Sequence, residues 1–489
     1  MSDAIFETTK GPVRGRDQGR TIRIARLRYA MPPLGARRFA LPDPVTPWRE
    51  TLDCSAGSPV PPQLPSRLAK VMGSYPAEQD EDCLHLDLWI PKDAPGPLPV
   101  LVFIHGGAFM TGGGAMSCYD GSALADREGV IVVNLSYRLG ALGFLPIEGI
   151  APANLGLRDQ EVALRFLREI VADFGGDAAN ITVSGQSAGA YSIQALQLRP
   201  GAASLFDRAA ILSSPMGLTA QPASSRAPYA ARFLEALGTS DPAGIRALPI
   251  ETILQAQVAV LKSMDNAPDN VAPPFMPVLD DWMPVDPTRP EAAAGAAWCP
   301  MVIGITREEH AAFHYEDAAF AEKAAALLPV RFRETFGARA EEELARARAM
   351  RSPATDARVL CDHGSRTRFV YGTFDYLEAA AAAGAGVWAY VFAWQSPNPE
   401  IGACHCIDLP FLFGNMADWE GAPMLAGAAP DTLADLARAF GGSIAAFARA
   451  GDPAAGRALD WPAFDATRAY CCFDSCITSP ALRPGCYPC

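Results

Sequence analysis

The sequence predicts an α/β fold in which a large, mostly parallel central sheet is flanked by helices. Two continuous apolar runs, at 98–105 and 129–135, have the character of strands that are buried on both faces. A third segment, 160–174, repeats apolar residues every three or four positions, as a helix with one buried side does. Strands that alternate with helices favour a parallel sheet covered on both faces.

Further elements continue this alternation along the chain. The remaining expected strands and helices lie at 180–184, 188–198, 208–213, 299–305, 387–394 and 431–450. Near the beginning, 14–28 interleaves arginines with apolar residues, which predicts a small antiparallel sheet. Residues 222–289 interrupt the rhythm of strands and helices. We expect them to form a helical insertion over the active site, because substrate selection often depends on such segments.

Composition limits the number of domains and the classes of partner. The chain has 489 residues, of which 49% are hydrophobic, so we expect one large core and a single domain over 1–489. The net charge is −13 and no basic stripe is visible, which argues against a nucleic-acid partner. The apolar stretch at 379–394 is shorter than the ~18 residues that span a bilayer. We expect a cytoplasmic monomer or weak homodimer with no membrane attachment.

The most specific local motif is Gly185-Gln186-Ser187-Ala188-Gly189, which follows an expected strand and precedes an expected helix. In this G-x-S-x-G context the two glycines permit a strained turn that raises the serine above the carboxyl edge of the sheet. The adjacent helix N-terminus stabilises negative charge. Ser187 is therefore the candidate nucleophile.

A second glycine-rich motif, His105-Gly106-Gly107, ends the expected strand at 98–105. Small residues allow backbone amides to approach the oxyanion that forms during acyl transfer, and HGG is the pattern expected there. The candidate donors are the amides of Gly106, Gly107 and Ala188.

Ser187 needs a general base, and the order serine, acid, histidine places that base later in the chain. Four of the six histidines follow Ser187: His310, His314, His363 and His405. His405 lies in a loop after the strand at 387–394, and so at the carboxyl edge of the sheet, where the serine also lies. The acid should come between them. Glu308 and Glu309 both follow the strand at 299–305, and either could orient the imidazole.

Further motifs extend over nearly the whole chain. They include RYAMPPLGARRFALP (28–42), EDCLHLDLWIP (81–91), NLSYRLGALGF (134–144), FGGDAANITVSGQSAGA (174–190), GITREEH (304–310) and GACHCIDLPFLF (402–413). Together they resemble the type B carboxylesterases, the family of para-nitrobenzyl esterases and cholinesterases in the α/β-hydrolase superfamily. The resemblance implies the α/β-hydrolase fold and selects Glu309 as the acid, five residues after Gly304. It also carries over Ser187 as nucleophile, His405 as base and Ser192 as a supporting serine.

The sequence departs from the family pattern where substrates would bind. Gln186 stands where Glu is usual, and Tyr75 is the only aromatic residue in the segment that carries a choline-stacking Trp in cholinesterases. A cation site would lack its carboxylate and its best aromatic face, so the resemblance implies uncharged substrates. Cys83 matches a family half-cystine, but Pro61 occupies the usual position of its disulfide partner, with Cys54 nearby.

These observations predict a serine carboxylic-ester hydrolase that acts on small to medium uncharged esters through an acyl-enzyme, with no cofactor. The alternatives are a carbamate or amide hydrolase, or a catalytically inactive cholinesterase-like binding protein.

A zinc hydrolase built on His310 and His314 would lack the Glu of H-E-x-x-H, because Ala311 stands there. We expect no metal site, although five cysteines crowd the last part of the chain: Cys471, Cys472, Cys476, Cys486 and Cys489. Cys404 and Cys406 flank His405. Either their modification by a bulky maleimide inactivates the enzyme, or both thiols face the core and do not react.

Overall fold

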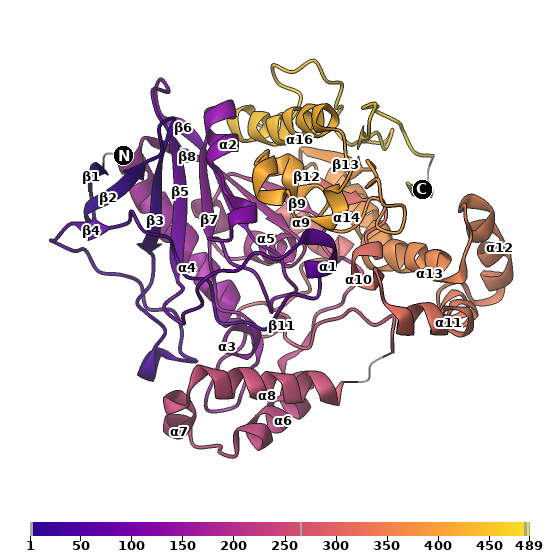
Figure 1. The fold of residues 1–489 in the computed structure, drawn as a ribbon, viewed down its shortest axis with the longest axis horizontal. Coiled ribbons are helices and arrows are strands. Elements are labelled where there is room, and N and C mark those ends of the chain that lie inside the picture. The colour runs from indigo at the N-terminus through magenta and orange to yellow at the C-terminus, as the bar shows by residue number, and fades with distance from the viewer. Residues whose placement is uncertain (1–2, 265–266, 484–486, 489) are drawn as a thin grey trace.

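A computed structural model describes residues 3–264, 267–483 and 487–488. Among these residues the centre is a 12-stranded sheet with the order β1-β2-β3-β5-β7-β6-β8-β9-β12-β13-β14, and β4 pairs with β2 (Figure 1). The strands are β1 Asp3–Thr8, β2 Gly11–Asp17, β3 Thr21–Arg28, β4 Leu52–Asp53, β5 His85–Pro91, β6 Leu98–Ile104, β7 Ile131–Leu135, β8 Gly176–Gln186, β9 Arg208–Leu212, β12 Met301–Thr306, β13 Val387–Phe392 and β14 Cys471–Phe473. The predicted α/β fold is confirmed.

The antiparallel strands near the beginning of the chain belong to this same sheet. Strands β1, β2, β3, β5 and β7 pair antiparallel in turn, and every later pair from β7 to β14 is parallel. The predicted antiparallel pairing at 14–28 is therefore confirmed, and it forms one edge of the central sheet. Strand β3 joins this edge to the rest of the sheet through β5, a pairing across more than 50 residues that local pattern does not reveal.

Helices cover both faces of the parallel part, as predicted. The helices are α1 Ala69–Met72, α2 Ser122–Glu128, α3 Gly140–Phe144, α4 Leu155–Ile170, α5 Ala188–Gln197, α6 Ala227–Leu237, α7 Pro242–Ala247, α8 Ile250–Ser263, α9 Ala293–Ala296, α10 Ala311–His314, α11 Ala318–Phe336, α12 Ala340–Met350, α13 Asp356–Ser365, α14 Tyr371–Ala382, α15 Leu409–Phe413 and α16 Pro430–Ala450. Alternate side chains of β6 enter two different cores. Val100 and Val102 pack with residues of α4 and α5, whereas Leu101 and Phe103 pack with residues of α2 and α16.

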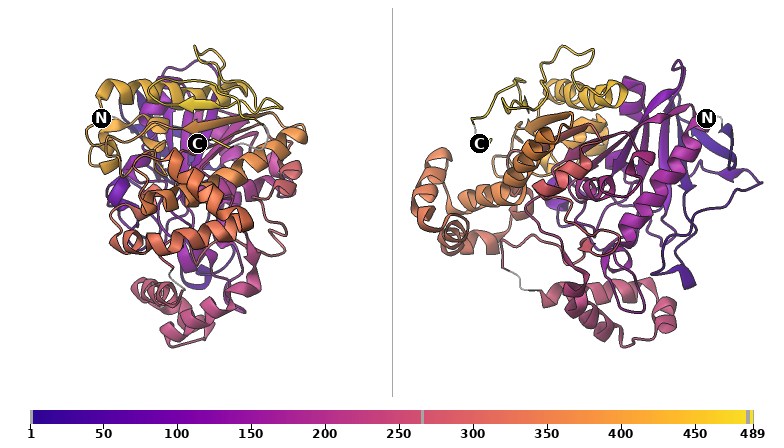
Figure 2. Two further views of the ribbon diagram at one scale, coloured as in Figure 1. Left: turned by 90° about the vertical axis from the view of Figure 1, so that its right-hand side faces the viewer. Right: turned by 180° about the vertical axis from the view of Figure 1, so that it is seen from behind.

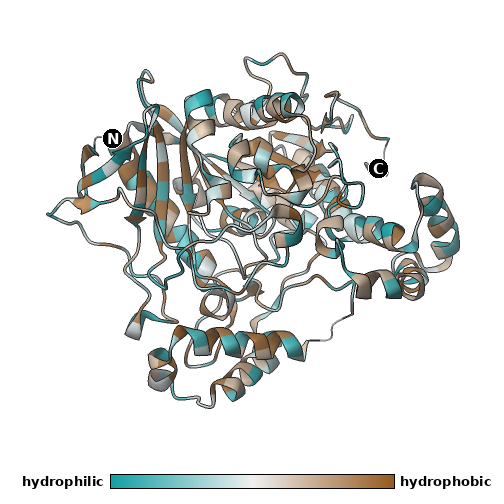
Figure 3. Ribbon diagram, viewed as in Figure 1, coloured by the Kyte–Doolittle hydropathy of each residue, from teal (hydrophilic) through white to brown (hydrophobic). Residues whose placement is uncertain are grey.

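The predicted insertion contains helices α6, α7 and α8, which lie together at one end of the molecule in every view (Figures 1 and 2). Hydrophilic and hydrophobic residues alternate along α8, as expected for a helix with one buried side (Figure 3). A second helical group, α11 to α13, has its own small core that includes Phe320, Leu328 and Phe332. Within the described residues, no helix combines the length and apolar character needed to cross a bilayer.

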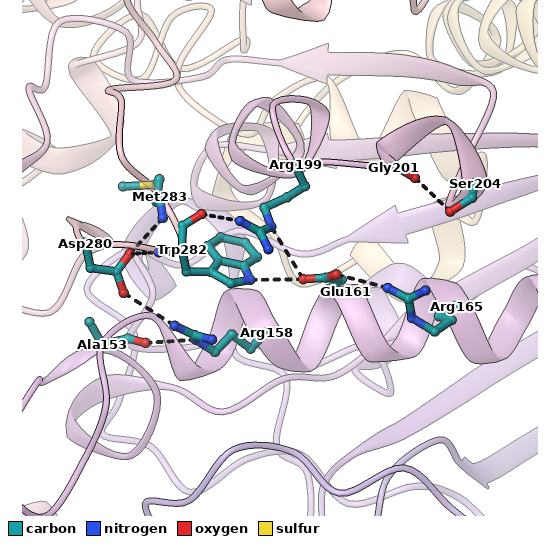
Figure 4. Close-up of polar contacts among 10 residues, drawn as sticks. All are labelled: Ala153, Arg158, Glu161, Arg165, Arg199, Gly201, Ser204, Asp280, Trp282 and Met283. Carbon is teal, nitrogen blue, oxygen red and sulfur yellow. Dashed lines mark hydrogen bonds and ion pairs between the residues drawn. The ribbon is translucent and has the colours of Figure 1, made fainter.

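Trp282 fixes the end of the insertion to the helices beside the central sheet (Figure 4). Its indole N–H donates to Glu161 of α4 at 3.0 Å. The guanidinium of Arg199 lies 4.3 Å from the indole ring centre and that of Arg158 lies 5.7 Å from it. Asp280 accepts hydrogen bonds from the backbone of Trp282 and Met283. Cation–π contact and hydrogen bonding thus hold this segment against α4.

Candidate active site

Ser187 stands alone between β8, which ends at Gln186, and α5, which begins at Ala188. Its backbone has φ 57° and ψ −117°, a conformation that costs energy for a residue other than glycine. A Cβ at Gly185 would lie 2.7 Å from the carbonyl carbon of Gly189, and one at Gly189 would lie 1.9 Å from the oxygen of Ile104. Both glycines are therefore required for the chain to turn sharply and present Ser187.

His405 and Glu309 meet at the same edge of the sheet. Nδ1 of His405 lies 2.5 Å from Oε2 of Glu309, and both side chains are buried. The other carboxylate oxygen of Glu309 accepts from the amide of Thr306, at the end of β12, at 2.8 Å. Glu309, and not Glu308, is thus the carboxylate in contact with the imidazole, and its position is fixed by the strand end.

The remaining imidazole nitrogen faces Gln186. Nε2 of His405 lies 3.1 Å from Nε2 of the Gln186 amide. Because Nδ1 of the neutral ring donates its hydrogen to Glu309, Nε2 accepts and the Gln186 amide donates. Among the described residues, the Ser187 hydroxyl has no hydrogen-bond partner, although Ser187 and His405 line one cavity. In this arrangement the Gln186 amide donates to the lone pair on Nε2 of His405, the same lone pair that would accept the proton of the Ser187 hydroxyl.

The glycines after β6 approach Ser187 closely. A Cβ at Gly106 would lie 3.1 Å from the Cβ of Ser187 and 2.8 Å from the carbonyl oxygen of Gln186. Gly107 has φ +109°, and a Cβ there would lie 2.1 Å from the oxygen of Thr111. In the described structure the amides of Gly106, Gly107 and Ala188 donate to no protein acceptor. Three unpaired donors beside Ser187 are suited to an oxyanion.

Two cavities meet at this glycine loop. The one that contains Ser187 and His405 has apolar walls that include Pro215, Leu218 and Met276. The other is lined by Gln186, Tyr75 and Cys406, and no acidic side chain is found among its described lining residues. Val271 and Pro273 join Met276 in the first cavity, whereas no described residue of α6, α7 or α8 does. The insertion therefore contributes an extended segment to the cavity wall, and the helices α6, α7 and α8 contribute no described lining residue.

Two aromatic rings that no sequence motif revealed pack beside the imidazole of His405. Phe313 lies 5.2 Å from the His405 ring centre, and Phe369 lies 5.1 Å from it. Phe369 belongs to a π-helical turn at Arg366–Val370, a distortion that is frequent at functional sites. These rings exclude water from the imidazole and strengthen its contact with Glu309.

Comparison with known proteins places the chain in a family. Residues 2–475 match the carboxylesterase family. The chain belongs to this family. It is 36% identical to the probable N-octanoylanthranilate hydrolase of Rhodococcus erythropolis, over 94% of this chain and 95% of the relative. It is 34% identical to the para-nitrobenzyl esterase of Bacillus subtilis, over 98% and 96%. The solved structure of the Geobacillus stearothermophilus carboxylesterase at pH 6.2 matches with a TM-score of 0.84 and 30% identity, over 98% of this chain and 97% of that one.

By family and by its para-nitrobenzyl esterase relative, the protein is a carboxylic-ester hydrolase. In this carboxylesterase the second candidate acid, Glu308, forms no hydrogen bond with His405 in the described structure. It is only 5% exposed, forms an ion pair with Arg351 at 2.5 Å and accepts from the amide of Ala403 at 2.7 Å. Burial acts to raise the pKa of Glu308, but Arg351 and the Ala403 amide outweigh it and lower that pKa. Glu308 thus holds the loop that carries His405.

Ser192 lies one turn along α5 and contacts the first turn of that helix. Its hydroxyl donates to the carbonyl of Ala188 at 2.9 Å and accepts from the side-chain amide of Gln160 at 3.2 Å. It forms no hydrogen bond with His405 or Glu309 in the described structure. Ser192 and Gln160 therefore join α5 to α4 behind Ser187.

The other histidines of the carboxylesterase are buried without a metal-binding arrangement. His310 and His314 have ring centres 5.5 Å apart, and His314 stacks on Phe320 at 3.8 Å. Burial lowers the pKa of His314 to about 4. Within the part of the chain that the structure describes, no group of three or more His, Cys, Asp or Glu side chains is placed to hold a metal.

The cysteines near the base are also buried. Cys404 is 0% exposed and Cys406 is 3% exposed, and burial raises the pKa of both thiols well above the usual value. This argues against the alternative that their modification inactivates the native enzyme, because only the thiolate reacts readily. Cys54 and Cys83 are free, buried thiols. Of the C-terminal cysteines, Cys486 and Cys489 lie outside the described residues.

Proposed function

We propose that this carboxylesterase is a serine hydrolase of small to medium uncharged esters that works through Ser187, His405 and Glu309. The observation that carries the proposal is the buried contact between Glu309 and His405, in a cavity shared with a strained Ser187. The apolar walls of that cavity support uncharged substrates. Nothing in this chemistry requires a cofactor.

The mechanism follows from the roles of these side chains. His405 turns from Gln186 to Ser187 and accepts the hydroxyl proton at Nε2 while the serine oxygen attacks the ester carbonyl. Glu309 holds the Nδ1 hydrogen and stabilises the imidazolium. The amides of Gly106, Gly107 and Ala188 donate to the tetrahedral oxyanion. The alcohol leaves with the proton from Nε2, and water then releases the acid by the same route.

Labelling with an organophosphate tests the nucleophile. The phosphoryl group should be found by peptide mass analysis on Ser187, and Ser187→Ala should lose both the label and esterase activity. An adduct on another residue, or full activity of Ser187→Ala, contradicts the assignment. Absence of hydrolysis of any short-chain chromogenic ester by the wild type would favour the inactive binding protein instead.

A second candidate activity is cleavage of amides or carbamates by the same residues. It is favoured by the relative whose name describes an N-acyl compound, N-octanoylanthranilate. Comparison of kcat/KM for phenyl acetate, acetanilide and a phenyl carbamate, with Ser187→Ala as the blank, separates these activities. We further propose a cytoplasmic enzyme that is a monomer or weak homodimer, and light scattering of the purified protein tests its oligomeric state.

A further inference from the structure

One cationic side chain lines the cavity that contains Ser187 and His405. Arg67 is the single Lys, Arg, Asp or Glu among the described residues of that lining. On the basis of the proposed function, we propose that Arg67 binds a carboxylate carried by the substrate apart from its scissile ester. Small esters in which an apolar spacer separates a carboxylate from the reacting carbonyl are then substrates in addition to the uncharged esters proposed above.

Arg67 is held in place by two contacts. One of its guanidinium nitrogens donates to the carbonyl oxygen of Val271 at 2.7 Å. Its guanidinium carbon lies 5.1 Å from the ring centre of Phe313, within the range of a cation–π contact. Phe313 in turn lies 5.2 Å from the ring of His405. The distance from the guanidinium carbon of Arg67 to the ring centre of His405 therefore does not exceed the sum of these two distances.

The charge of Arg67 has no acidic partner. Among the described residues no carboxylate lies within 4.0 Å of its guanidinium, whereas Arg38, Arg138 and Arg331 are all paired with acids. Among the described residues its guanidinium donates one hydrogen bond, which uses one of its five N–H donors, and Arg67 as a whole residue is exposed. A guanidinium with free donors binds a carboxylate through two parallel hydrogen bonds.

The other walls of this cavity determine the rest of the substrate. Leu218, Met276 and Phe369 are apolar and offer no partner for a second charge. The neighbouring cavity beyond Gly107 has no charged side chain among its described lining residues. A carboxylate near Arg67 and an uncharged spacer across these walls match both features. Monoesters of dicarboxylic acids and esters of hydroxybenzoic acids have this form.

Two matched pairs of esters test the proposal, one with the carboxylate on the acyl group and one with the carboxylate on the leaving group. The first is the 4-nitrophenyl monoester of adipic acid against its methyl-capped form. The second is 3-acetoxybenzoate against methyl 3-acetoxybenzoate. For each pair the measured quantity is the ratio of kcat/KM for the anionic ester to that for the neutral ester, which cancels general effects on catalysis. The proteins are wild type, Arg67→Gln, Arg67→Lys and Lys70→Gln.

Lys70 is the matched control because it lies on the same short segment but does not line the cavity. Its ammonium donates to the carbonyl of Glu316. In at least one pair, Arg67→Gln should lower the ratio by about 3- to 10-fold. This range lies between the effect of losing an exposed ion pair and the effect of losing a hydrogen bond to a charged group. Arg67→Lys should keep most of the ratio, since it keeps the charge, and Lys70→Gln should keep all of it.

Three results would overturn the site. These are an unchanged ratio in both pairs for Arg67→Gln, an equal fall in Lys70→Gln, or an equal fall in Arg67→Lys. Thermal melts of all variants verify folding. The activity of the wild type tests the proposed function separately. If the wild type hydrolyses these esters but the ratio does not depend on Arg67, only the carboxylate site is refuted. If the wild type hydrolyses none of the four esters, the esterase assignment itself is refuted.

Discussion

Replacement of Gln186 by Glu tests the hydrogen bond that this residue makes to the base. Nε2 of His405 must accept the proton of Ser187, and the Gln186 amide nitrogen lies 3.1 Å from it. An amide donor stabilises the neutral imidazole, whereas a carboxylate in the same place stabilises the imidazolium. Glu and Gln have the same shape, so the substitution changes charge and hydrogen-bonding capacity with little change in packing.

The distance gives the size of the effect. Opposite unit charges 3.1 Å apart attract by about 5 kcal/mol at an effective dielectric constant of roughly 20. The cost of burying the new carboxylate removes part of this, and an opposite charge at such a distance shifts a titration by about 1–3 pH units. The imidazole must be neutral to accept a proton. We therefore expect the acid limb of kcat/KM to lie about 1–3 pH units higher in Gln186→Glu than in wild type.

The assay is the pH profile of kcat/KM for phenyl acetate, followed by pH-stat from acid to alkaline solution. Gln186→Met is the matched control, because it removes the amide donor without adding charge. Its acid limb should move in the same direction by less than that of Gln186→Glu. An unmoved limb in Gln186→Glu, or a shift to lower pH, would refute the reasoning that Gln186 acts on the base through this contact.

The remaining predictions concern the carboxylates and substrate charge. Glu309→Gln should lower kcat at least about 100-fold with little effect on folding, because an amide cannot stabilise the imidazolium. Glu308→Gln should instead lower the unfolding free energy by about 1–3 kcal/mol, since it breaks the ion pair with Arg351, with a smaller loss of kcat; calorimetry and kinetics of both variants decide between these roles. Burial and the neighbouring Glu309 raise the pKa of Asp408 to about 7, so the ionisation of this one carboxyl should lower stability by about 2–4 kcal/mol as pH rises from about 4 to about 7. Thermal melts of Asp408→Asn should lack this fall, whereas the exposed Glu420→Gln should retain it. Butyrylcholine should be hydrolysed no faster than its neutral isostere 3,3-dimethylbutyl butyrate, and a several-fold preference in kcat/KM would indicate a cation site.

Local sequence was sufficient to find the residues that meet at the sheet edge. Ser187 and His405 each follow a strand of the parallel sheet, and the carboxyl ends of such strands lie at one edge. The candidate acid was harder to choose, because Glu308 and Glu309 are neighbours after β12. Their roles differ through contacts from far along the chain, with His405 for one and with Arg351 and Ala403 for the other. No pattern around Glu308 could reveal that it is buried.

The walls of the cavity were not predictable from local pattern for a related reason. Arg67 and Val271 lie in irregular segments, where neither helical nor strand periodicity assigns a side chain to one face. Phe313 and Phe369 come from a four-residue helix and a π-helical turn. All four residues acquire their roles from contacts across the fold. In contrast, the glycines at 185 and 189 were predictable, because any side chain there collides with the backbone next to the nucleophile.

The attachment of Trp282 to α4 has a consequence for how this enzyme diverges from its relatives. The segment at 271–276 forms part of the cavity wall, and Trp282 secures the chain just after it to the central layer. None of these residues shares an element with Ser187, Glu309 or His405. Substitutions or insertions at 271–276 can thus alter which acyl or alcohol groups fit while the reacting atoms keep their positions. Directed evolution of new specificities is best begun in this short stretch, with Trp282 left in place as its anchor.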